Sequence, residues 1–240
     1  MATAMAIGTL GYAGVLRTER TEEKSWLTGL SGATTAVLAK ASTPMVLQPG
    51  ELVYCEGVNA TGAYIVRRGK VKLVASSSDG KALILRIALP GEIIGLSAAL
   101  STRSHDTNAE VLEPTSVAYI KTSTLYELME KSSDLALRLA EQLSIEYSSL
   151  CQELSTLGLQ RSAISRLAKL LAGLLDGTEP VRGKIQLTCN LTHEEMAQMI
   201  GTSRETVTRL LRELRDQGIA TLKNNILVID GVDRLKALID

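Results

Sequence analysis

The chain has 240 residues, and its 26 Lys and Arg are balanced by 26 Asp and Glu, so its formal net charge is zero. This length allows one large or two small domains, each with a real hydrophobic core. Zero net charge excludes bulk basicity as a source of affinity for nucleic acid, and such binding would depend on locally placed cations.

Cysteine usage and hydropathy bear on the cellular compartment. Cys55, Cys151 and Cys189 lie far apart without a C-x-x-C pair, which favours free thiols in a reducing cytoplasm over a disulfide framework. No apolar run approaches the length of a membrane span. The first 16 residues contain no Lys or Arg, and a signal peptide would begin with a positive region, so residues 1–21 are interpreted as a loose N-terminal arm.

The N-terminal half of the chain predicts one helix followed by many short strands. A helix is expected over residues 22–40, ended by Pro44, with apolar positions at Trp26, Leu27, Leu30, Val37 and Leu38. Residues 45–120 alternate between apolar and polar side chains, and turn signals punctuate them at Pro49-Gly50, Arg68-Gly69, Asp79-Gly80 and Pro90-Gly91. Regular short strands of this kind indicate an antiparallel barrel or sandwich.

Helical patterns follow the strands. A short helix is expected over 123–130 and a long one over 133–157, with apolar residues at alternating spacings of four and three: Ala136, Ala140, Leu143, Tyr147, Leu150, Leu154 and Leu157. Two copies of such a stripe can bury each other as a coiled-coil seam, although the stripe could instead pack on the strands, or do both. A hinge is expected at 158–162, followed by a helix from Ser162 to about Gly177.

Residues 192–215 predict two short helices joined by a tight turn, after a strand over 179–187. Gly201 separates the two helical patterns and is expected to end the first helix through a positive φ. Capping boxes are expected at Thr192 with Glu195 and at Thr202 with Glu205. The spacing is typical of a helix-turn-helix.

The second of these helices has one buried and one exposed face. Val207, Leu210, Leu211 and Leu214 form the apolar face, while the other face carries Arg204, Glu205, Thr208, Arg209 and Arg212. This mixture can read base edges and hold phosphates; the alternative is a helical hairpin with a solvated charged face. Residues 219–229 then predict two strands around an Asn-Asn turn, which is a wing, and 232–238 a closing helix.

The run T-S-R-E-T-V-T-R-L-L at 202–211 resembles the recognition helix of the Crp/Fnr family of bacterial transcription regulators. The resemblance extends over about residues 25–230. It implies an α+β fold: a jelly-roll-like antiparallel β-roll similar to cyclic-nucleotide-binding domains over 22–132, a dimerisation helix over 133–158, and a winged helix-turn-helix domain over 159–240. Gly50, Gly57, Gly62 and Gly69 would then occupy the corners of the roll. A generic β-sandwich without a ligand is the alternative.

The resemblance also implies partners and contacts. Arg204, Glu205 and Arg209 match the family positions that read a T-G-T-G-A half-site, whereas Fnr-like relatives lack the first arginine and read T-T-G-A-T. The partners implied are a palindromic DNA operator, a second copy of the chain and RNA polymerase. Phosphate contacts are expected from Thr192, Ser203, Thr206, Thr208 and Arg212, and dimer contacts from Leu143, Tyr147, Leu150, Leu154 and Leu157.

The effector-binding segment departs from the pattern of cyclic-AMP-binding members. Leu96 stands where the family has a glutamate for the ribose, and Thr107-Asn108 replaces its Arg-Ser pair. A buried phosphate would lack its arginine, and Arg103 lies several residues away, so cyclic AMP is not expected to bind. The candidate effector pocket comprises Gly95, Leu96, Ser97, Arg103, Thr107, Asn108, Leu150 and Cys151.

Other sensing and functional classes have weaker support. No cysteine precedes Cys55, which argues against an Fnr-type iron–sulfur cluster, and no cofactor is expected. Haem at His105 or redox sensing at Cys151 stay as alternatives; a lone loop histidine is expected to be solvent-exposed, and a cysteine in an apolar helix to be buried. No nucleophile–base pair, metal cluster or phosphate loop supports an enzyme, and the recognition helix argues against an adaptor that does not bind DNA.

Overall fold

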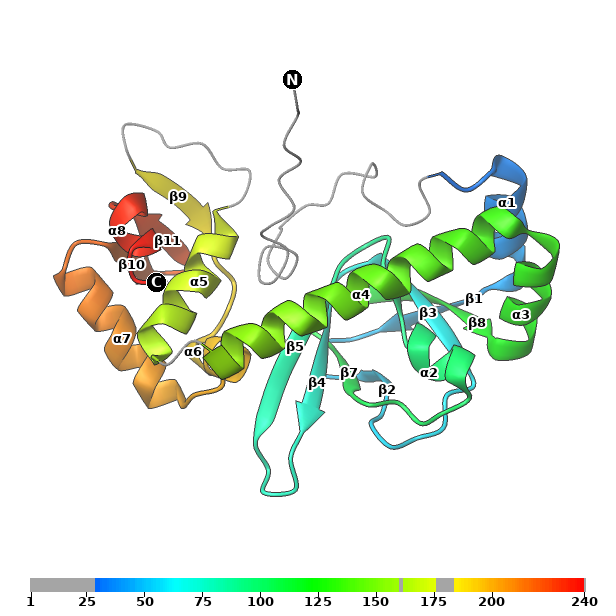
Figure 1. Ribbon diagram of the computed structural model, residues 1–240, viewed down its shortest axis with the longest axis horizontal. Helices are drawn as coiled ribbons and strands as arrows, with labels where there is room; N and C mark the ends of the chain where they lie inside the picture. Colours follow the sequence, from blue (N-terminus) through cyan, green and yellow to red (C-terminus); the bar gives the residue numbers. More distant parts are fainter. Residues whose placement is uncertain (1–28, 160–161, 176–183, 240) are drawn as a thin grey trace. The chain divides into compact units, whose positions relative to one another are not determined.

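The computed structural model describes residues 29–159, 162–175 and 184–239, and the side chains of 152–159 are not among those described. The residue contacts divide the chain near Ser148 into two compact units. The N-terminal unit holds α1 to α3, β1 to β8 and the first part of α4, and the C-terminal unit holds α5 to α8 with β9 to β11 (Figure 1). None of the described helices is both long enough and apolar enough to span a bilayer.

Two antiparallel four-stranded sheets form a β-roll in the N-terminal unit, as the alternation in the sequence predicted. The first sheet contains, in hydrogen-bonded order, β1 (Thr43–Leu47), β8 (Thr115–Lys121), β3 (Gly62–Arg68) and β6 (Ile93–Ile94). The second contains β2 (Leu52–Tyr54), β7 (Asn108–Val111), β4 (Val71–Ser76) and β5 (Ala82–Ala88). The predicted fold class is therefore confirmed.

Of the four glycines expected at the corners of the roll, three have the positive φ of a turn and one does not. Gly50, Gly57 and Gly69 have φ between 77° and 85°. Gly62, in contrast, is the first residue of β3 and not a corner. A Cβ at this position would lie 2.2 Å from the Ile120 carbonyl oxygen, so the residue is small because a neighbouring strand passes close to it.

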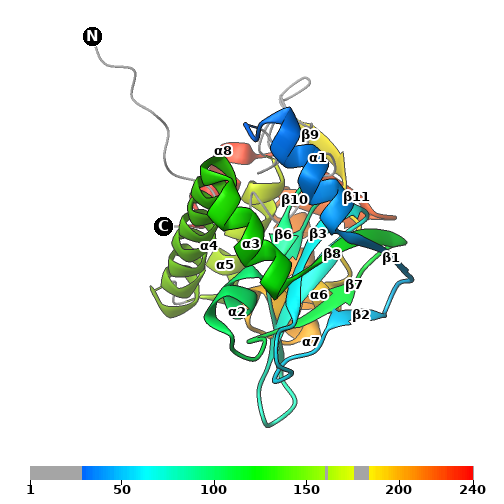
Figure 2. The same cartoon turned by 90° about the vertical axis from the view of Figure 1, so that its right-hand side faces the viewer.

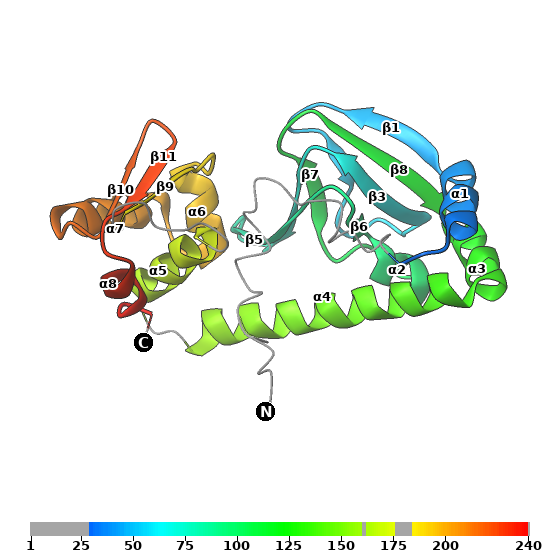
Figure 3. The ribbon, with the colours of Figure 1, turned by 90° about the horizontal axis from the view of Figure 1, so that it is seen from above.

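Three helices and the long helix α4 close the open side of the roll. They are α1 (Gly32–Ala41), α2 (Leu96–Ser101), α3 (Thr122–Lys131) and α4 (Ser133–Leu159). Figure 2 shows α1 beside α3 at one end of the roll, and Figure 3 shows the first part of α4 running past α2 and α3. The expected helix over 22–40 is observed from Gly32 only; its earlier part lies outside the described residues, as does the expected arm at 1–21.

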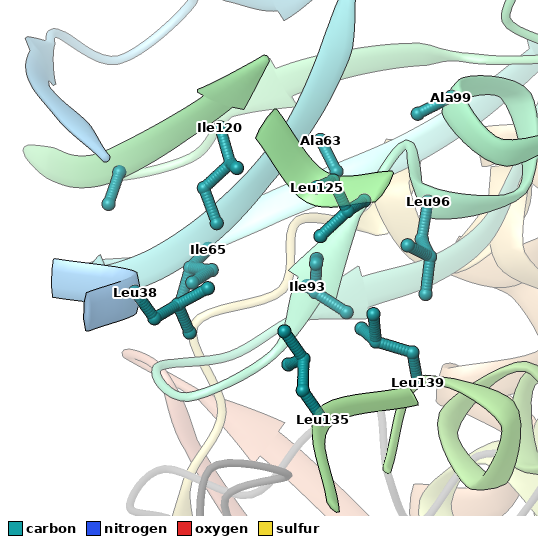
Figure 4. Packing of buried hydrophobic residues seen from close by; sticks show 11 residues of the cluster. Leu38, Ala63, Ile65, Ile93, Leu96, Ala99, Ile120, Leu125, Leu135 and Leu139 are labelled. Atoms are coloured by element: carbon teal, nitrogen blue, oxygen red, sulfur yellow. The ribbon is translucent and has the colours of Figure 1, made fainter. Parts of the chain in front are cut away.

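Packing between α4 and the roll forms the main core of this unit. Leu135 and Leu139 of α4 are fully buried against Ile65, Ile93 and Leu96, and Figure 4 shows these side chains converging with Leu125 of α3. Each such side chain contributes about 1.5–3 kcal/mol on burial. Leu143 packs at the margin of the same cluster. One side of α4 is therefore committed to the roll.

The carboxylate of Asp134 joins α1 to the start of α4. It accepts hydrogen bonds from the Ser31 backbone N–H at 3.0 Å and from the Thr34 hydroxyl at 3.0 Å. The Ser132 hydroxyl also donates to it. These bonds hold the pKa of Asp134 well below its usual range, with the Ser132 hydroxyl as the largest cause and the Ser31 amide next.

The C-terminal unit is a three-stranded sheet with helices on it. Its elements are α5 (Ala163–Leu174), β9 (Ile185–Thr188), α6 (His193–Ile200), α7 (Arg204–Asp216), β10 (Ala220–Lys223), β11 (Ile226–Ile229) and α8 (Val232–Lys236). The sheet order is β10-β11-β9. Asn224 and Asn225 both have positive φ and form the predicted wing turn. α5 ends at Leu174, before the expected end near Gly177, and the expected start of the strand at Glu179 falls on residues that are not described.

Candidate nucleic-acid interface and effector pocket

A left-handed glycine ends α6, and a side-chain N-cap begins each of the helices α6 and α7. Gly201 has φ 62°, which costs little in glycine because it has no Cβ. The capping box at the start of α6 is present: the Thr192 hydroxyl accepts from the Glu195 backbone N–H, and the Glu195 carboxylate accepts from the Thr192 N–H. Both bonds satisfy donors that the first helical turn leaves open.

The second predicted capping box is wrong by one residue. The N-cap of α7 is Ser203, whose hydroxyl oxygen accepts from the Thr206 backbone N–H at 3.2 Å. The predicted box also required the Glu205 carboxylate to accept from the Thr202 N–H, but this N–H donates to the Ala197 carbonyl at 3.0 Å and so still closes α6. Glu205 therefore lies in the first turn of α7 without a capping partnership to Thr202.

One face of α7 is buried and the other carries exposed charge. Val207, Leu210, Leu211 and Leu214 are the buried residues of this helix. Five exposed side chains occupy the other face: Arg204, Glu205, Thr208, Arg209 and Arg212. Within the described residues, no ion pair involves any of these three arginines. Their guanidinium groups are thus available to an external anion or to base acceptors.

Glu205 is held in its charged form at the start of the same helix. Its own backbone N–H, followed by the Ser203 hydroxyl, lowers the pKa of this carboxyl. A carboxylate at this position is a hydrogen-bond acceptor only, which suits an exocyclic amino donor in the major groove. This face of α7 therefore combines one acceptor-only side chain with three arginine donors.

Two arginines from outside the pair brace the ends of α6 and α7. Arg166 of α5 donates to the Ile200 carbonyl at 2.7 Å, at the end of α6. Arg234 of α8 donates to the carbonyls of Gln217 and Gly218 at 3.0 and 2.6 Å, just beyond α7. Helix C-termini leave carbonyls without intrahelical partners, and cations there are favourable. These contacts fix the orientation of the two helices against their neighbours.

The structure adds His193, which the sequence analysis did not propose as a site residue. Its Nδ1 lies 2.9 Å from the Thr208 hydroxyl oxygen. Because the Thr208 proton is donated to the Arg204 carbonyl at 2.9 Å, Nδ1 must be the donor, and the Nε2 atom is left without this bond. The one available signal was the position of His193 as the first residue of α6.

The hydroxyls expected to contact phosphate are already engaged within the helices. Thr192 donates to Glu195, and the Ser203 and Thr206 hydroxyls lie 3.1 Å apart. Thr208 donates to a carbonyl, as described above. A phosphate contact by the Thr192 or Thr208 hydroxyl would therefore replace an internal hydrogen bond. One proton joins Ser203 to Thr206, so the other of these two hydroxyls can still donate. Arg212 has no ion pair among the described residues.

The residues at the effector positions make internal contacts. Leu96 is 1 % exposed and belongs to the core of the roll. The Asn108 side-chain oxygen accepts from the Glu56 backbone N–H at 3.0 Å, and the Thr107 side chain hydrogen-bonds the Tyr54 hydroxyl. Leu96 offers no polar atom for a ribose, and the bonds made by Thr107 and Asn108 stabilise the protein's own fold.

His105 is buried, so the expectation that it is solvent-exposed was wrong. It is 5 % exposed, and its ring stacks on Tyr54 with centroids 3.8 Å apart. Burial lowers the pKa of His105 and is the largest cause of a rise in the pKa of Tyr54 to about 12, so both rings are neutral. Gly95 permits this stack because a Cβ there would lie 3.0 Å from the imidazole.

The remaining candidate pocket residues lie at the surface of the described chain. Arg103 and Ser97 are exposed. The backbone of Arg103 is fixed by bonds to Ala98 and Ala60. Cys151 is exposed and not buried as expected. Leu150 of α4 is 41 % exposed.

The predicted apolar stripe on α4 divides between two environments. Leu143 contacts the core of the roll, while Ala140, Tyr147 and Leu150 are exposed. Tyr147 is 70 % exposed, which is unusual for a large apolar surface in a helix centre. Leu154 and Leu157 belong to the same stripe, but their side chains lie outside those described.

A β-roll followed by a braced helix-turn-helix and wing defines a DNA-binding regulator with a sensor-type domain. Comparison with known proteins agrees: residues 44–132 match the cyclic nucleotide-binding domain and 165–238 the Crp-like helix-turn-helix domain. The chain belongs to the Crp/Fnr family of transcription regulators and is not an enzyme.

Individual relatives are similar over most of their length. The CRP-like cAMP-activated global transcriptional regulator of Mycobacterium tuberculosis is 29 % identical over 213 residues, covering 86 % of this chain and 92 % of the relative. The structure of FixK2 from Bradyrhizobium japonicum is 28 % identical with TM-score 0.69, covering 82 % and 96 %. A CooA mutant from Carboxydothermus hydrogenoformans, 22 % identical with TM-score 0.77 and coverages of 94 % and 98 %, shares the fold.

Proposed function

We propose that the chain acts as a homodimer on a palindromic operator with T-G-T-G-A-like half-sites, and that it does so without cyclic AMP. The observation that carries this proposal is the exposed face of α7, where Arg204, Glu205 and Arg209 have no competing ion pair among the described residues. An arginine fork fits the O6 and N7 acceptors of guanine, and a carboxylate accepts from cytosine N4.

Phosphate contacts would supply affinity, and Arg212 is the strongest candidate. It lies two turns along α7 from Arg204 and is exposed without an ion pair among the described residues. The backbone N–H groups at the starts of α6 and α7 would add to it. The hydroxyls of Thr192, Ser203, Thr206 and Thr208 would orient these groups more than they bind.

Dimerisation is supported by the exposed part of the α4 stripe. Ala140, Tyr147 and Leu150 are exposed and share one side of the helix, since they are separated by seven and three residues. A second copy of α4 would bury them as a parallel seam. Two recognition helices related by a twofold axis would then lie about 34 Å apart, one turn of DNA.

The absence of a cyclic-AMP response is proposed against the names of some relatives, which are described as cAMP-activated. It is supported by the core packing of Leu96 and by the hydrogen bonds that Thr107 and Asn108 make within the protein. A haem- or redox-responsive regulator is the second candidate; Cys151 is exposed as a redox sensor requires, whereas His105 is stacked on Tyr54.

Further proposals follow from family membership. RNA polymerase is the expected protein partner, the cytoplasm the expected compartment, and the functional division is 1–21, 22–132, 133–158 and 159–240. Each of these rests on the resemblance and on the sequence pattern.

Selection of binding sites from random DNA tests the proposed operator. Purified wild-type protein should enrich palindromes containing G-T-G-A-like arms, in the absence of added nucleotide. Enrichment of T-T-G-A-T arms would assign the chain to Fnr-like reading, and failure to enrich any sequence would remove the proposal. A gel shift with the selected site and a scrambled site of equal length provides the matched control.

A further inference from the structure

A partly buried charge cluster lies between the β-roll and α4, and neither the family motifs nor the candidate pocket includes it. Arg86 of β5 donates from Nη1 to the Glu92 carboxylate at 2.7 Å and from Nη2 to the Glu146 carboxylate at 2.9 Å. The three side chains are 21 %, 13 % and 23 % exposed. Glu92 belongs to the turn between β5 and β6, and Glu146 to α4.

The guanidinium group therefore joins two structural elements through its two terminal nitrogens. A planar fork can hold two carboxylates in fixed directions, which the single ammonium of lysine cannot reproduce. Each carboxylate also accepts a second hydrogen bond. Glu92 accepts from the Leu89 backbone N–H at 3.4 Å, and Glu146 accepts from the Gln142 side chain at 3.2 Å.

This cluster adjoins the residues that occupy the candidate effector pocket. Tyr54, which stacks on His105 and bonds to Thr107, lies within electrostatic range of both Arg86 and Glu146. A bound effector in such a site would act by contacting the roll and α4 together. Here a protein side chain makes that connection.

We propose that Arg86 is a positioning residue, an internal tether that holds α4 on the β-roll and replaces a bound effector in setting the register of the long helix. The proposal rests on the proposed function in one respect: α4 is taken to carry the dimer seam that spaces the two recognition helices. Under this arrangement operator binding is constitutive, because the contact that a ligand would supply is always present. Truncating one member of a partly buried pair leaves its partner unpaired, and this loss exceeds the gain from the pair itself.

Hydrogen exchange of α4 tests the tether without reference to DNA. In the full-length chain, Arg86→Gln and Glu146→Gln should each raise the exchange of amides in 133–151 by about tenfold or more. Glu141→Gln is the matched control, because Glu141 pairs with Arg138 at 2.7 Å on the same helix but is 47 % exposed. It should leave this exchange unchanged. If the amides of 133–151 in Arg86→Gln exchange at the same rate as in the wild type, the proposal is overturned.

Operator affinity tests whether the Arg86 tether affects the spacing of the two recognition helices. Arg86→Gln should bind the full palindrome about tenfold more weakly than wild type or Glu141→Gln, yet bind a single half-site equally well. Arg86→Lys should resemble Arg86→Gln, since it keeps the charge without the fork. Equal loss on half-site and palindrome would contradict a positioning role.

Two controls separate the possible failures. Circular dichroism establishes that each variant is folded, and if Arg86→Gln does not fold, Arg86→Lys carries the comparison. If wild-type protein binds no palindrome, the proposed function fails, while the exchange experiment still decides whether the tether exists.

Discussion

At the scale of single residues, Arg204 and Arg212 lie on the same exposed face of α7 but are expected to make different DNA contacts. Arg204→Ala should cost about 1–3 kcal/mol and relax the preference at one G·C pair, because a bidentate base contact is lost. Arg212→Ala should weaken all sequences alike and reduce the salt slope by about one. Site selection and salt titration of both variants check this, and each serves as the control for the other. Unchanged sequence preference in Arg204→Ala would show that the reading face is assigned wrongly.

Several features at this scale could not be predicted from the sequence. The cap of α7 differs by one residue from the prediction because Thr202 is needed to close α6, which local spacing does not reveal. The burial of His105 depends on a ring contributed by a distant strand. The Arg86 cluster joins residues 6 and 60 positions apart, and no periodic pattern indicates such a contact.

At the scale of elements, the start of α7 offers a direct test of whether Ser203 or Thr202 is the N-cap. Ser203→Ala should lower the free energy of unfolding by about 1 kcal/mol, because the Thr206 N–H loses its acceptor. Thr202→Ala, its neighbour, should have a much smaller effect, since its backbone bond to Ala197 remains. Chemical denaturation of both variants measures the difference. The reverse order would restore Thr202 as the cap.

The junction of α1 and α4 should give stability a defined dependence on pH. The folded state lowers the pKa of Asp134 below the ordinary value of 3.8, so its contribution is fully present above that pH and is lost as the pH falls toward the folded pKa. Asp134→Asn should therefore be less stable than wild type at neutral pH, and the gap should close in acid. Urea unfolding of both proteins between about pH 7 and pH 2 measures it. A gap that is independent of pH would exclude this carboxylate as the cause.

Element types were the most predictable part of the fold. Gly201 and the two 3.6-residue patterns around it located α6 and α7, and the Asn-Asn pair located the wing turn. These signals are local, because capping, turn conformation and amphipathic spacing depend on residues close in sequence. The pairing order of the eight strands of the roll depends on contacts across the chain, and no local pattern predicts it; the family resemblance implied only the type of fold.

At the scale of the whole molecule, the exposed stripe of α4 leads to a test of assembly. Leu150→Asp would place an uncompensated charge in the proposed seam, so sedimentation should show a monomer and operator binding should collapse. Ile145→Asp is the matched control, because Ile145 is 52 % exposed and lies on the opposite side of the helix from the stripe. A tight dimer in Leu150→Asp would place the interface elsewhere.

The effector proposal is tested on the intact protein by titration calorimetry with cyclic AMP. The internal contacts of Leu96, Thr107 and Asn108 predict no saturable binding at micromolar protein. Binding tighter than about 10 µM, or roughly −7 kcal/mol, would contradict the proposal and bring the chain closer to its cAMP-activated relatives.

The three cysteines differ in exposure, so their reactivity toward a thiol reagent can report local opening of the protein. Cys55 and Cys151 are exposed, whereas Cys189 is buried beneath the wing turn, where its N–H donates to the Asn225 carbonyl at 2.7 Å and burial raises the pKa of its thiol. A thiol reagent will therefore label Cys189 only when the DNA-binding unit opens. In a chain reduced to this one thiol, by replacing Cys55 and Cys151 with serine, the labelling rate reports the opening of that unit alone. The difference in this rate with and without operator then measures how strongly DNA holds the wing closed.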